Sequence, residues 1–272
     1  MIALISCEED VKNFRLPEFE QKLVISSFIS PIDTVSYIYI SSNRRIYGEL
    51  NRNESLGNLT AYISDNTREI PLDTSRYGFK LQHDDMLIEE GKTYNLRVIS
   101  DKGLAAEASC TVPLNRNLKL EADTSRTVYS SSPYENFSVL KMNISFTDFP
   151  GEDNYYRLYC EQETYKFSPK PINYTTSFSG FTNEFFNDNG NKGEKSLITS
   201  ININDIKNID SSFFRIYIFN TDKAYYDYHI SLKNYNGGED PFTEASPIYS
   251  NVTGGLGIFA AYTVDSLVFR LK

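Results

Sequence analysis

The chain has 272 residues and a formal net charge of -9, with 40% hydrophobic and 23% charged residues. These are globular proportions, and the length suits two domains. The acidic balance argues against a nucleic-acid partner, which would need a clustered positive surface. No apolar run approaches the roughly 18 residues that cross a bilayer, so we expect any membrane attachment to be covalent or through a partner.

The N-terminal stretch 1-MIALISCEED-10 places Leu4-Ile5-Ser6 directly before Cys7. It is similar to a bacterial lipobox, in which the cysteine thiol is diacylated and becomes the new N-terminus. We predict that residues 1–6 are a signal-peptide remnant whose upstream part is missing, and that residues 7–20 are the lipidated cysteine and its tether. The alternative is a buried cysteine in an edge strand.

The acidic residues that follow Cys7 are Glu8, Glu9 and Asp10. They resemble the export signal that sends lipoproteins of Bacteroidetes to the outer face of the outer membrane. An ordinary solvated tether explains them equally well.

Short strand-like runs separated by turn signals fill the first half of the chain. They are 22–30, 36–43, 58–64, 68–72, 78–81, 93–100 and 104–112. This pattern is typical of an immunoglobulin- or fibronectin-like β-sandwich, which we predict over residues 21–114. Tyr94 follows a glycine-containing turn at the start of the penultimate strand, where a tyrosine corner bonds its hydroxyl back to the upstream backbone. We predict a structural role for it.

A second β-sandwich domain that carries a short helix is predicted over residues 115–272. Residues 113–127 are polar and indicate a linker that runs into a new first strand, and residues 163–195 indicate a long loop that is functional or disordered. The predicted strands are 137–146, 154–162, 196–203, 212–220 and one or two strands within 257–271. The complete fold is therefore expected to be all-β.

The helix is predicted within residues 221–238, with Thr221 as its N-cap and Gly237-Gly238 as its end. One face collects residues at helical spacing, and we expect it to pack on the second sheet. These residues are Tyr225, Tyr228, His229, Leu232 and Tyr235.

Catalytic chemistry finds little support in the residues. The two histidines are His83, beside carboxylates, and His229, on the predicted helix, where we expect a satisfied ring nitrogen. Neither a G-x-S-x-G elbow nor clustered zinc ligands occur in the sequence. Loop 187–194 offers Asp188 and Glu194 as calcium ligands, but its spacing is not that of an EF-hand, so we favour a solvated turn. We predict no catalytic residue, metal or cofactor.

The remaining cysteines, Cys110 and Cys160, fall in different predicted domains. Buried free thiols are therefore favoured over a disulfide between them.

Several segments together resemble the DUF4249 family. They are the lipobox-like start, 17-PEFEQKLVISSFISPIDTV-35, 87-LIEEGKTYNLRV-98, 105-AAEASCTVP-113 and 240-DPFTEASPIYSNVTGGLGIFAAY-262. The resemblance covers nearly the whole chain after Cys7. It implies a cell-envelope lipoprotein of Bacteroidetes, of a kind often encoded beside TonB-dependent transporters, with no established enzymatic activity and no catalytic residues to transfer.

The most specific part of that resemblance contains Gly254, Gly255 and Gly257. These glycines indicate a turn with positive φ or a close backbone approach before the final strand. The alternative is a surface that contacts a partner.

We therefore expect a non-enzymatic outer-membrane lipoprotein, anchored through Cys7, that is an accessory or interaction partner of a TonB-dependent transporter. The cell surface is favoured over the periplasmic face. Two alternatives are a surface module that binds a glycan or small ligand, and an adhesive or fimbrial subunit.

Overall fold

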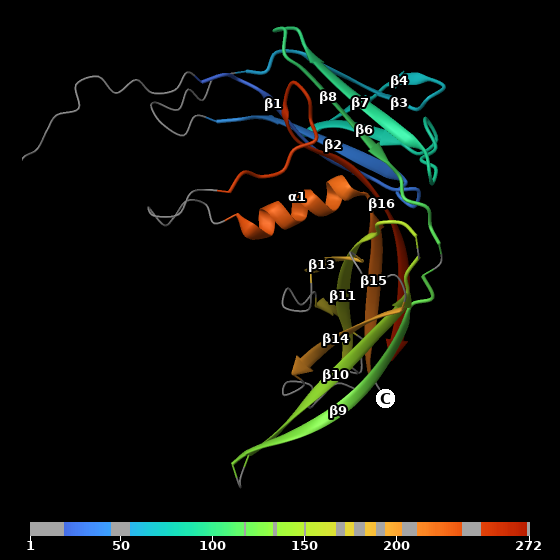
Figure 1. The fold of residues 1–272 in the computed structure, drawn as a ribbon. Helices are drawn as coiled ribbons and strands as arrows, with labels where there is room; N and C mark the ends of the chain where they lie inside the picture. The colour runs from blue at the N-terminus through green and yellow to red at the C-terminus, as the bar shows by residue number, and fades with distance from the viewer. Residues whose placement is uncertain are drawn as a thin grey trace, which may run out of the picture.

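The structure, a computed structural model, describes most of the chain in ten stretches. They are residues 19–44, 55–116, 118–132, 135–149, 151–166, 172–176, 183–188, 194–202, 211–235 and 246–270. Within them, strands form sheets of nine, three and four strands, accompanied by one helix (Figure 1). The prediction of an all-β, sandwich-type fold is confirmed.

The N-terminal half packs two sheets face to face. One layer contains β1 (Leu23–Ile29), β2 (Val35–Ser42), β6 (Gly78–Gln82) and β5 (Asp73–Ser75). The other contains β4 (Glu69–Pro71), β3 (Leu59–Ser64), β7 (Thr93–Ser100) and β8 (Ala105–Thr111). Buried and less buried residues alternate along β1 and β8, so each strand gives every second side chain to the shared core.

The C-terminal half is also built from strands. A three-stranded sheet contains β9 (Glu121–Ser132), β10 (Glu135–Thr147) and β14 (Glu194–Asn202). It faces β11 (Tyr155–Lys166), β12 (Ile172–Thr176), β13 (Asn183–Asn187) and β15 (Ser211–Thr221), which belong to the nine-stranded sheet. Two small core clusters lie between the sheets; they include Ile144, Phe146, Leu158 and Phe214.

One prediction about a connection was wrong in the described residues. Residues 163–195 are not a continuous loop, because β12 and β13 both pair antiparallel with β11. Their aromatic and β-branched residues favour strand structure, although the surrounding Asn- and Ser-rich composition indicated a loop. The prediction that the linker 113–127 runs into a new first strand is confirmed, because β9 begins at Glu121 and pairs with β10 along most of its length.

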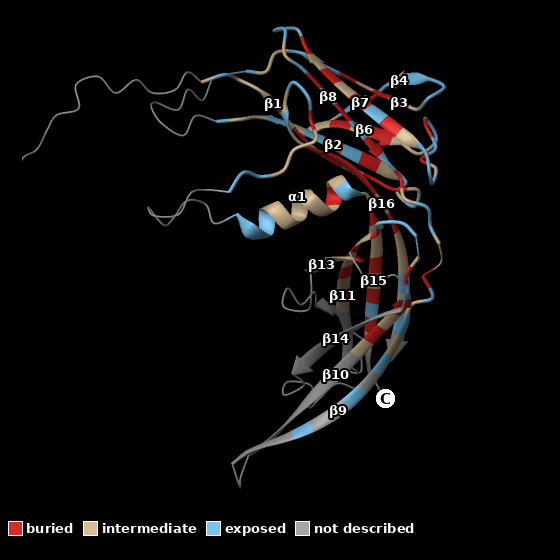
Figure 2. Ribbon diagram, viewed as in Figure 1, coloured by how far each residue is buried: buried red, intermediate tan, exposed pale blue. Residues whose placement is uncertain are grey.

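The last strand, β16 (Leu256–Arg270), connects the two halves. Its first part pairs parallel with β1, from Val24 opposite Leu256 to Ile29 opposite Ala261. Its second part pairs antiparallel with β15. The N-terminal core accordingly contains side chains from residues 252–261, which the predicted division had assigned to the second domain. Figure 2 shows β16 as a largely buried strand where it passes between the halves.

Helix α1 (Lys223–Asn234) lies on the face of β16 that points away from the N-terminal core. The predicted N-cap was wrong. Thr221 ends β15 and its hydroxyl donates to Tyr155 O at 3.2 Å, whereas the Asp222 side chain accepts from Tyr225 N. An aspartate carboxylate is a better N-cap acceptor than a threonine hydroxyl that is already bonded elsewhere.

Candidate interaction surface

The helix packs on both halves of the nine-stranded sheet rather than on the second half alone. Tyr225 is 3% exposed and packs with Ile258 and Ala260 of β16. Its ring lies 5.0 Å from that of Phe28 on β1, and Phe185 of β13 belongs to the same cluster. An aromatic cluster therefore joins the helix to the sheet where β16 changes partner.

His229 is part of this cluster. Its ring stacks on Tyr225 at 4.3 Å and on Phe185 at 4.9 Å between centroids. Nδ1 lies 2.8 Å from Tyr225 O, which can only accept, so Nδ1 is the donor. Burial lowers the pKa of His229. The expected satisfied ring nitrogen on a helix face is confirmed.

Asp222 ties the start of the helix to β16. Oδ1 accepts from Tyr225 N at 2.8 Å, and Oδ2 accepts from Ala261 N at 3.1 Å. The Asp222 N–H donates in turn to Ala261 O at 3.0 Å. Burial raises the pKa of Asp222 to about 7, an effect that the two N–H donors only partly offset.

Arg157 supports the same cluster from β11. Its guanidinium donates to the Tyr225 hydroxyl at 2.5 Å and lies 5.3 Å from the Phe219 ring and 5.6 Å from the Phe185 ring. Cation–π contacts of this kind strengthen as water is excluded. The helix is therefore positioned by the Asp222 carboxylate, which caps its start, and by the Arg157 guanidinium, which contacts its side.

Beside the helix, the outward face of the sheet carries exposed tyrosines. Tyr37 and Tyr39 of β2 stack with ring centroids 6.2 Å apart and are 48% and 49% exposed. Ser27 pairs with Ile38 in the antiparallel register, which places Phe28 opposite Tyr37. Directly opposite residues point to the same face of a sheet, so Phe28 and Tyr37 share a face. We call Phe28, Tyr37, Tyr39 and Tyr228 the aromatic face.

The aromatic face continues into a second group of exposed side chains, which we call the apolar end. It contains Leu232 (40% exposed), Tyr235 (46%), Ile248 (42%) and Leu256 (41%). Tyr249 N donates to Ser231 Oγ at 2.9 Å, which holds the segment containing Ile248 against the helix. Leu256 pairs with Val24 near the start of β1.

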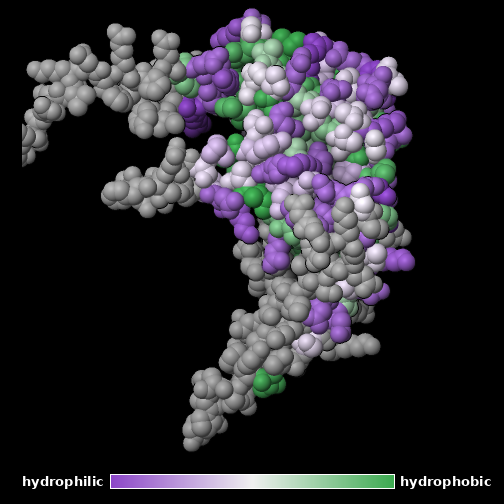
Figure 3. All heavy atoms as spheres, in the orientation of Figure 1, coloured by the Kyte–Doolittle hydropathy of each residue, from purple (hydrophilic) through white to green (hydrophobic). Residues whose placement is uncertain are grey.

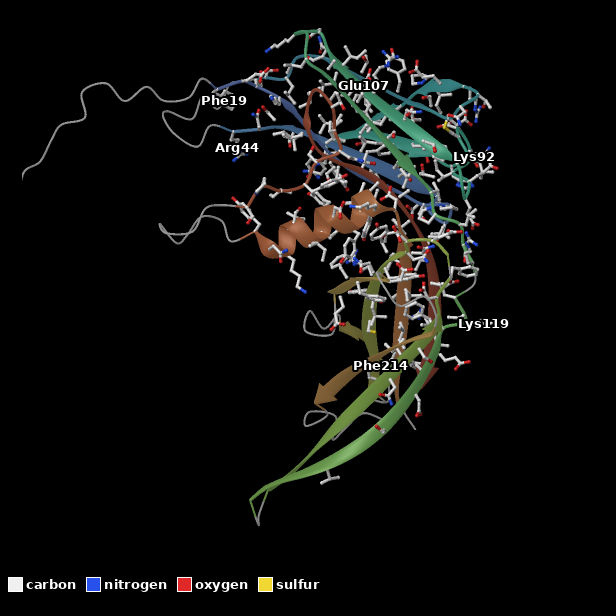
Figure 4. The ribbon with its side chains drawn as sticks, in the orientation of Figure 1. Phe19, Arg44, Lys92, Glu107, Lys119 and Phe214 are labelled. Atoms are coloured by element: carbon white, nitrogen blue, oxygen red, sulfur yellow. The ribbon has the colours of Figure 1, made fainter. Side chains whose placement is uncertain are left out.

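The apolar end lies at the same end of the fold as the first described residues. The Asn43 side chain accepts from Lys22 N at 2.7 Å and donates to Glu20 O at 2.9 Å, joining the strand ends. Figure 4 shows Phe19 and Arg44 side by side there, and Figure 1 shows α1 ending on this side. Cys7, Glu8, Glu9 and Asp10 lie outside the described residues.

The other predicted structural residues have clear positions. The buried Tyr94 hydroxyl donates to Leu87 O at 3.0 Å and accepts from Glu89 N at 2.8 Å, the contacts expected of a tyrosine corner. Burial raises the pKa of Tyr94. Cys110 and Cys160 are buried free thiols that lie in separate cores.

The predicted glycines lie against neighbouring backbones. Gly254 and Gly257 have φ of +72° and +107°, whereas Gly255 has no positive φ. A Cβ would lie 2.5 Å from Ala105 O at Gly254 and 2.7 Å from Leu23 O at Gly255, and would overlap Ile25 O at Gly257. The segment therefore permits β16 to approach β1 and β8 closely, as expected.

A polar groove of about 490 Å³ lies on the opposite sheet of the N-terminal half. Arg97 pairs with Glu69 at 2.9 Å, and its guanidinium lies 4.7 Å from the Tyr62 ring centroid. The groove is lined by Ser64, Glu69, Asn95, Leu96, Arg97, Glu107, Ala108, Ser109, Asn251 and Thr253. None of these described lining residues is aromatic, so the groove offers hydrogen bonds but no stacking platform for a sugar ring.

Two negative findings concern the described residues alone. They contain no group of three or more His, Cys, Asp or Glu side chains arranged to hold a metal ion. They also contain no helix that is both long and apolar enough to span a bilayer.

Comparison with known proteins identifies a family but no characterised relative. The model of the family described as Domain of unknown function (DUF4249) matches residues 9–267. A search of the curated proteins found no match. Because the family match covers nearly the whole chain, the protein belongs to the DUF4249 family.

Proposed function

We propose that this protein is a lipid-anchored, non-enzymatic accessory of an outer-membrane TonB-dependent transporter. The observation that carries the proposal is that the apolar end lies at the same end of the fold as Phe19, the first described residue. If Cys7 is acylated, this is the end of the fold from which the tether leads to the membrane.

The tether limits how far the fold can stand from the bilayer. Twelve residue steps separate Cys7 from Phe19, so the reach is at most about 40 Å even for a fully extended chain. The aromatic face and the apolar end are therefore held within reach of the loops of a membrane-embedded partner. Tethering also raises the effective concentration of the two proteins, so a modest interface is sufficient.

The chemistry of this surface favours a protein partner over bare lipid. Tyrosine is enriched in protein interfaces because it combines a large apolar ring with a hydrogen-bonding hydroxyl. The chain carries a net charge of -9, which opposes docking on anionic headgroups. Hydrophilic residues predominate on the described part of the N-terminal half seen in Figure 3.

The test is crosslinking in native membranes followed by purification of the full chain. We expect a TonB-dependent transporter to be recovered with the wild type. The double variant Leu232→Ser/Tyr235→Ser should weaken binding about thirtyfold, because two interface anchors that each contribute about 1 kcal/mol are lost together. Val128→Ser, at a side chain 62% exposed on β9, is the matched control and should bind normally. Recovery of no transporter with the wild type would refute the proposal.

A second candidate function is binding of a small polar ligand, such as an oligosaccharide, in the groove beside Arg97. The groove volume and its polar lining favour it, whereas the coverage of Tyr62 by Arg97 does not. Glycan-array binding that is lost in Arg97→Ala and kept in Leu232→Ser/Tyr235→Ser would favour this function over the first.

A further inference from the structure

Two buried aspartates meet at the end of the C-terminal half that adjoins the N-terminal half (Figure 1). Asp148 directly follows β10, Asp188 directly follows β13, and each is 1% exposed. Between them lies Asn154, which directly precedes β11 and is 9% exposed. The prediction that Asp188 belongs to a solvated turn was therefore wrong, because the pairing of β13 with β11 draws it under the loop 148–154.

The Asn154 side chain lies at the centre of a set of oxygen atoms. Nδ2 is 3.3 Å from Asp148 Oδ1, 3.2 Å from Asp188 Oδ2, 3.0 Å from Phe149 O and 3.3 Å from Glu152 O. An amide nitrogen carries only two hydrogens, so it cannot satisfy four acceptors at once. The four acceptor oxygen atoms thus outnumber the two hydrogens that the Asn154 amide can donate.

Asp148 has an oxygen atom that no described residue contacts by a hydrogen bond. Its Oδ1 accepts from the Tyr156 hydroxyl at 2.6 Å, but Oδ2 is buried and accepts from no donor in the described part of the chain. Asp188, by contrast, accepts from Asn154 N at 2.9 Å in addition to the side-chain amide. A buried carboxylate oxygen without a donor is costly, because it loses its water without replacement.

Positive charge is also lacking at the two carboxylates. Neither Asp148 nor Asp188 forms an ion pair with any described residue, and the nearby Arg116 pairs with Glu152 instead. Two buried negative charges are costly unless donors or a cation compensate them. Carboxylate and backbone carbonyl oxygens are the ligands that a hard cation prefers.

We propose that Asp148 and Asp188, together with the carbonyl oxygens of Phe149 and Glu152, bind a calcium ion. Calcium takes six to eight oxygen ligands from carboxylates, backbone carbonyls, amides and water, and tolerates irregular geometry. Rotation of the Asn154 amide would present its Oδ1 in place of Nδ2. Magnesium fits less well, because it demands near-octahedral geometry and retains several waters.

The direct test is calorimetric titration of calcium chloride into the full chain after treatment with EDTA. We expect saturable binding with a dissociation constant of about 0.1–1 mM, as in extracellular calcium modules. Calcium at ten times that concentration should raise the melting temperature by about 3–6 °C, whereas magnesium should not. A wild-type chain that shows neither heat of binding nor a calcium-dependent shift would overturn the proposal.

Terbium luminescence locates the ion. The chain contains no tryptophan, so terbium bound at this site would be excited mainly by Tyr156, whose hydroxyl contacts Asp148. We expect emission that calcium displaces and that Tyr156→Phe greatly weakens while calorimetric calcium binding persists. Emission unchanged in Tyr156→Phe would place the ion elsewhere and overturn the proposal.

Three variants complete the test. Asp148→Asn and Asp188→Asn should each abolish the calcium-dependent rise in melting temperature, with folding verified by circular dichroism. Asp153→Asn alters an exposed carboxylate in the same loop and should leave the rise intact. An equal loss in Asp153→Asn would indicate a general charge effect and overturn the proposal.

Discussion

Asp222 is expected to make the stability of the folded chain depend on pH, and a single substitution should remove that dependence. Its carboxylate caps α1 through Tyr225 N and also accepts from Ala261 N of β16. Burial raises its pKa to about 7. Asp222→Asn keeps an oxygen for the helix cap, because asparagine is an equally good N-cap, but it does not titrate.

The sign and size of the effect follow from the two pKa values. The unfolded carboxyl group titrates near pH 3.9, whereas the folded one retains its proton up to about pH 7. Between these pH values the folded state binds more protons. Its stabilising contribution is therefore complete below about pH 4 and is lost as the pH rises to 7. A shift of about three pKa units corresponds to at most about 4 kcal/mol in the free energy of unfolding.

The assay is urea unfolding of wild type and Asp222→Asn from pH 4 to pH 8, followed by circular dichroism. The free energy of unfolding of the wild type, relative to that of the variant, should fall by up to about 4 kcal/mol as the pH rises. His229, whose pKa is lowered by burial, acts with the opposite sign but is present in both proteins and cancels. A difference between the two proteins that stays constant within about 0.5 kcal/mol across this range would refute the reasoning.

Three further substitutions, two of them paired with a control, test the fold and the anchor. Tyr94→Phe removes both corner hydrogen bonds and should lower the free energy of unfolding by about 1–3 kcal/mol, whereas Tyr77→Phe, 59% exposed, should not change it. Gly257→Ala forces a side chain onto Ile25 O and should cost more than about 4 kcal/mol, measured by denaturation. At Gly103 φ is also positive, at +83°, but an added Cβ would meet no atom within 4 Å. Gly103→Ala should therefore lower the free energy of unfolding by only about 1–2 kcal/mol. Cys7→Ser should release the protein from the membrane fraction; retention there would contradict lipid anchoring.

Local pattern predicted most of the strands because each strand buries alternate side chains. In β1 and β8 the alternation is regular, and the observed strands differ from the predicted ones by about one residue at each end. The tyrosine corner was predictable for the same reason, since Tyr94 and its partners Leu87 and Glu89 lie close in sequence. Strands β12 and β13 were missed because each is only five residues long and the surrounding Asn- and Ser-rich composition indicated a loop.

The candidate sites depend on contacts between distant residues, which periodicity does not encode. Asp148 and Asp188 are forty residues apart in sequence, and only the pairing of β13 with β11 brings them to the same amide. The aromatic face likewise combines β1, β2 and α1. The helix face was predictable from its spacing, but the exposure of Leu232 and Tyr235 was not, because it depends on where the sheet beneath the helix ends.

Strand β16 contributes to both halves of the chain, because it pairs with β1 and with β15. Its residues Phe259 and Ala261 enter the N-terminal core, while Ile258 and Ala260 on the opposite face receive the helix. Removal of β16 would therefore expose β1 along its edge and leave α1 without its main support. The family match, which extends to residue 267, includes nearly all of this strand. The aromatic face and the apolar end combine residues of β1 and β2 with residues of α1 and β16. A partner that binds there therefore contacts both halves of the chain.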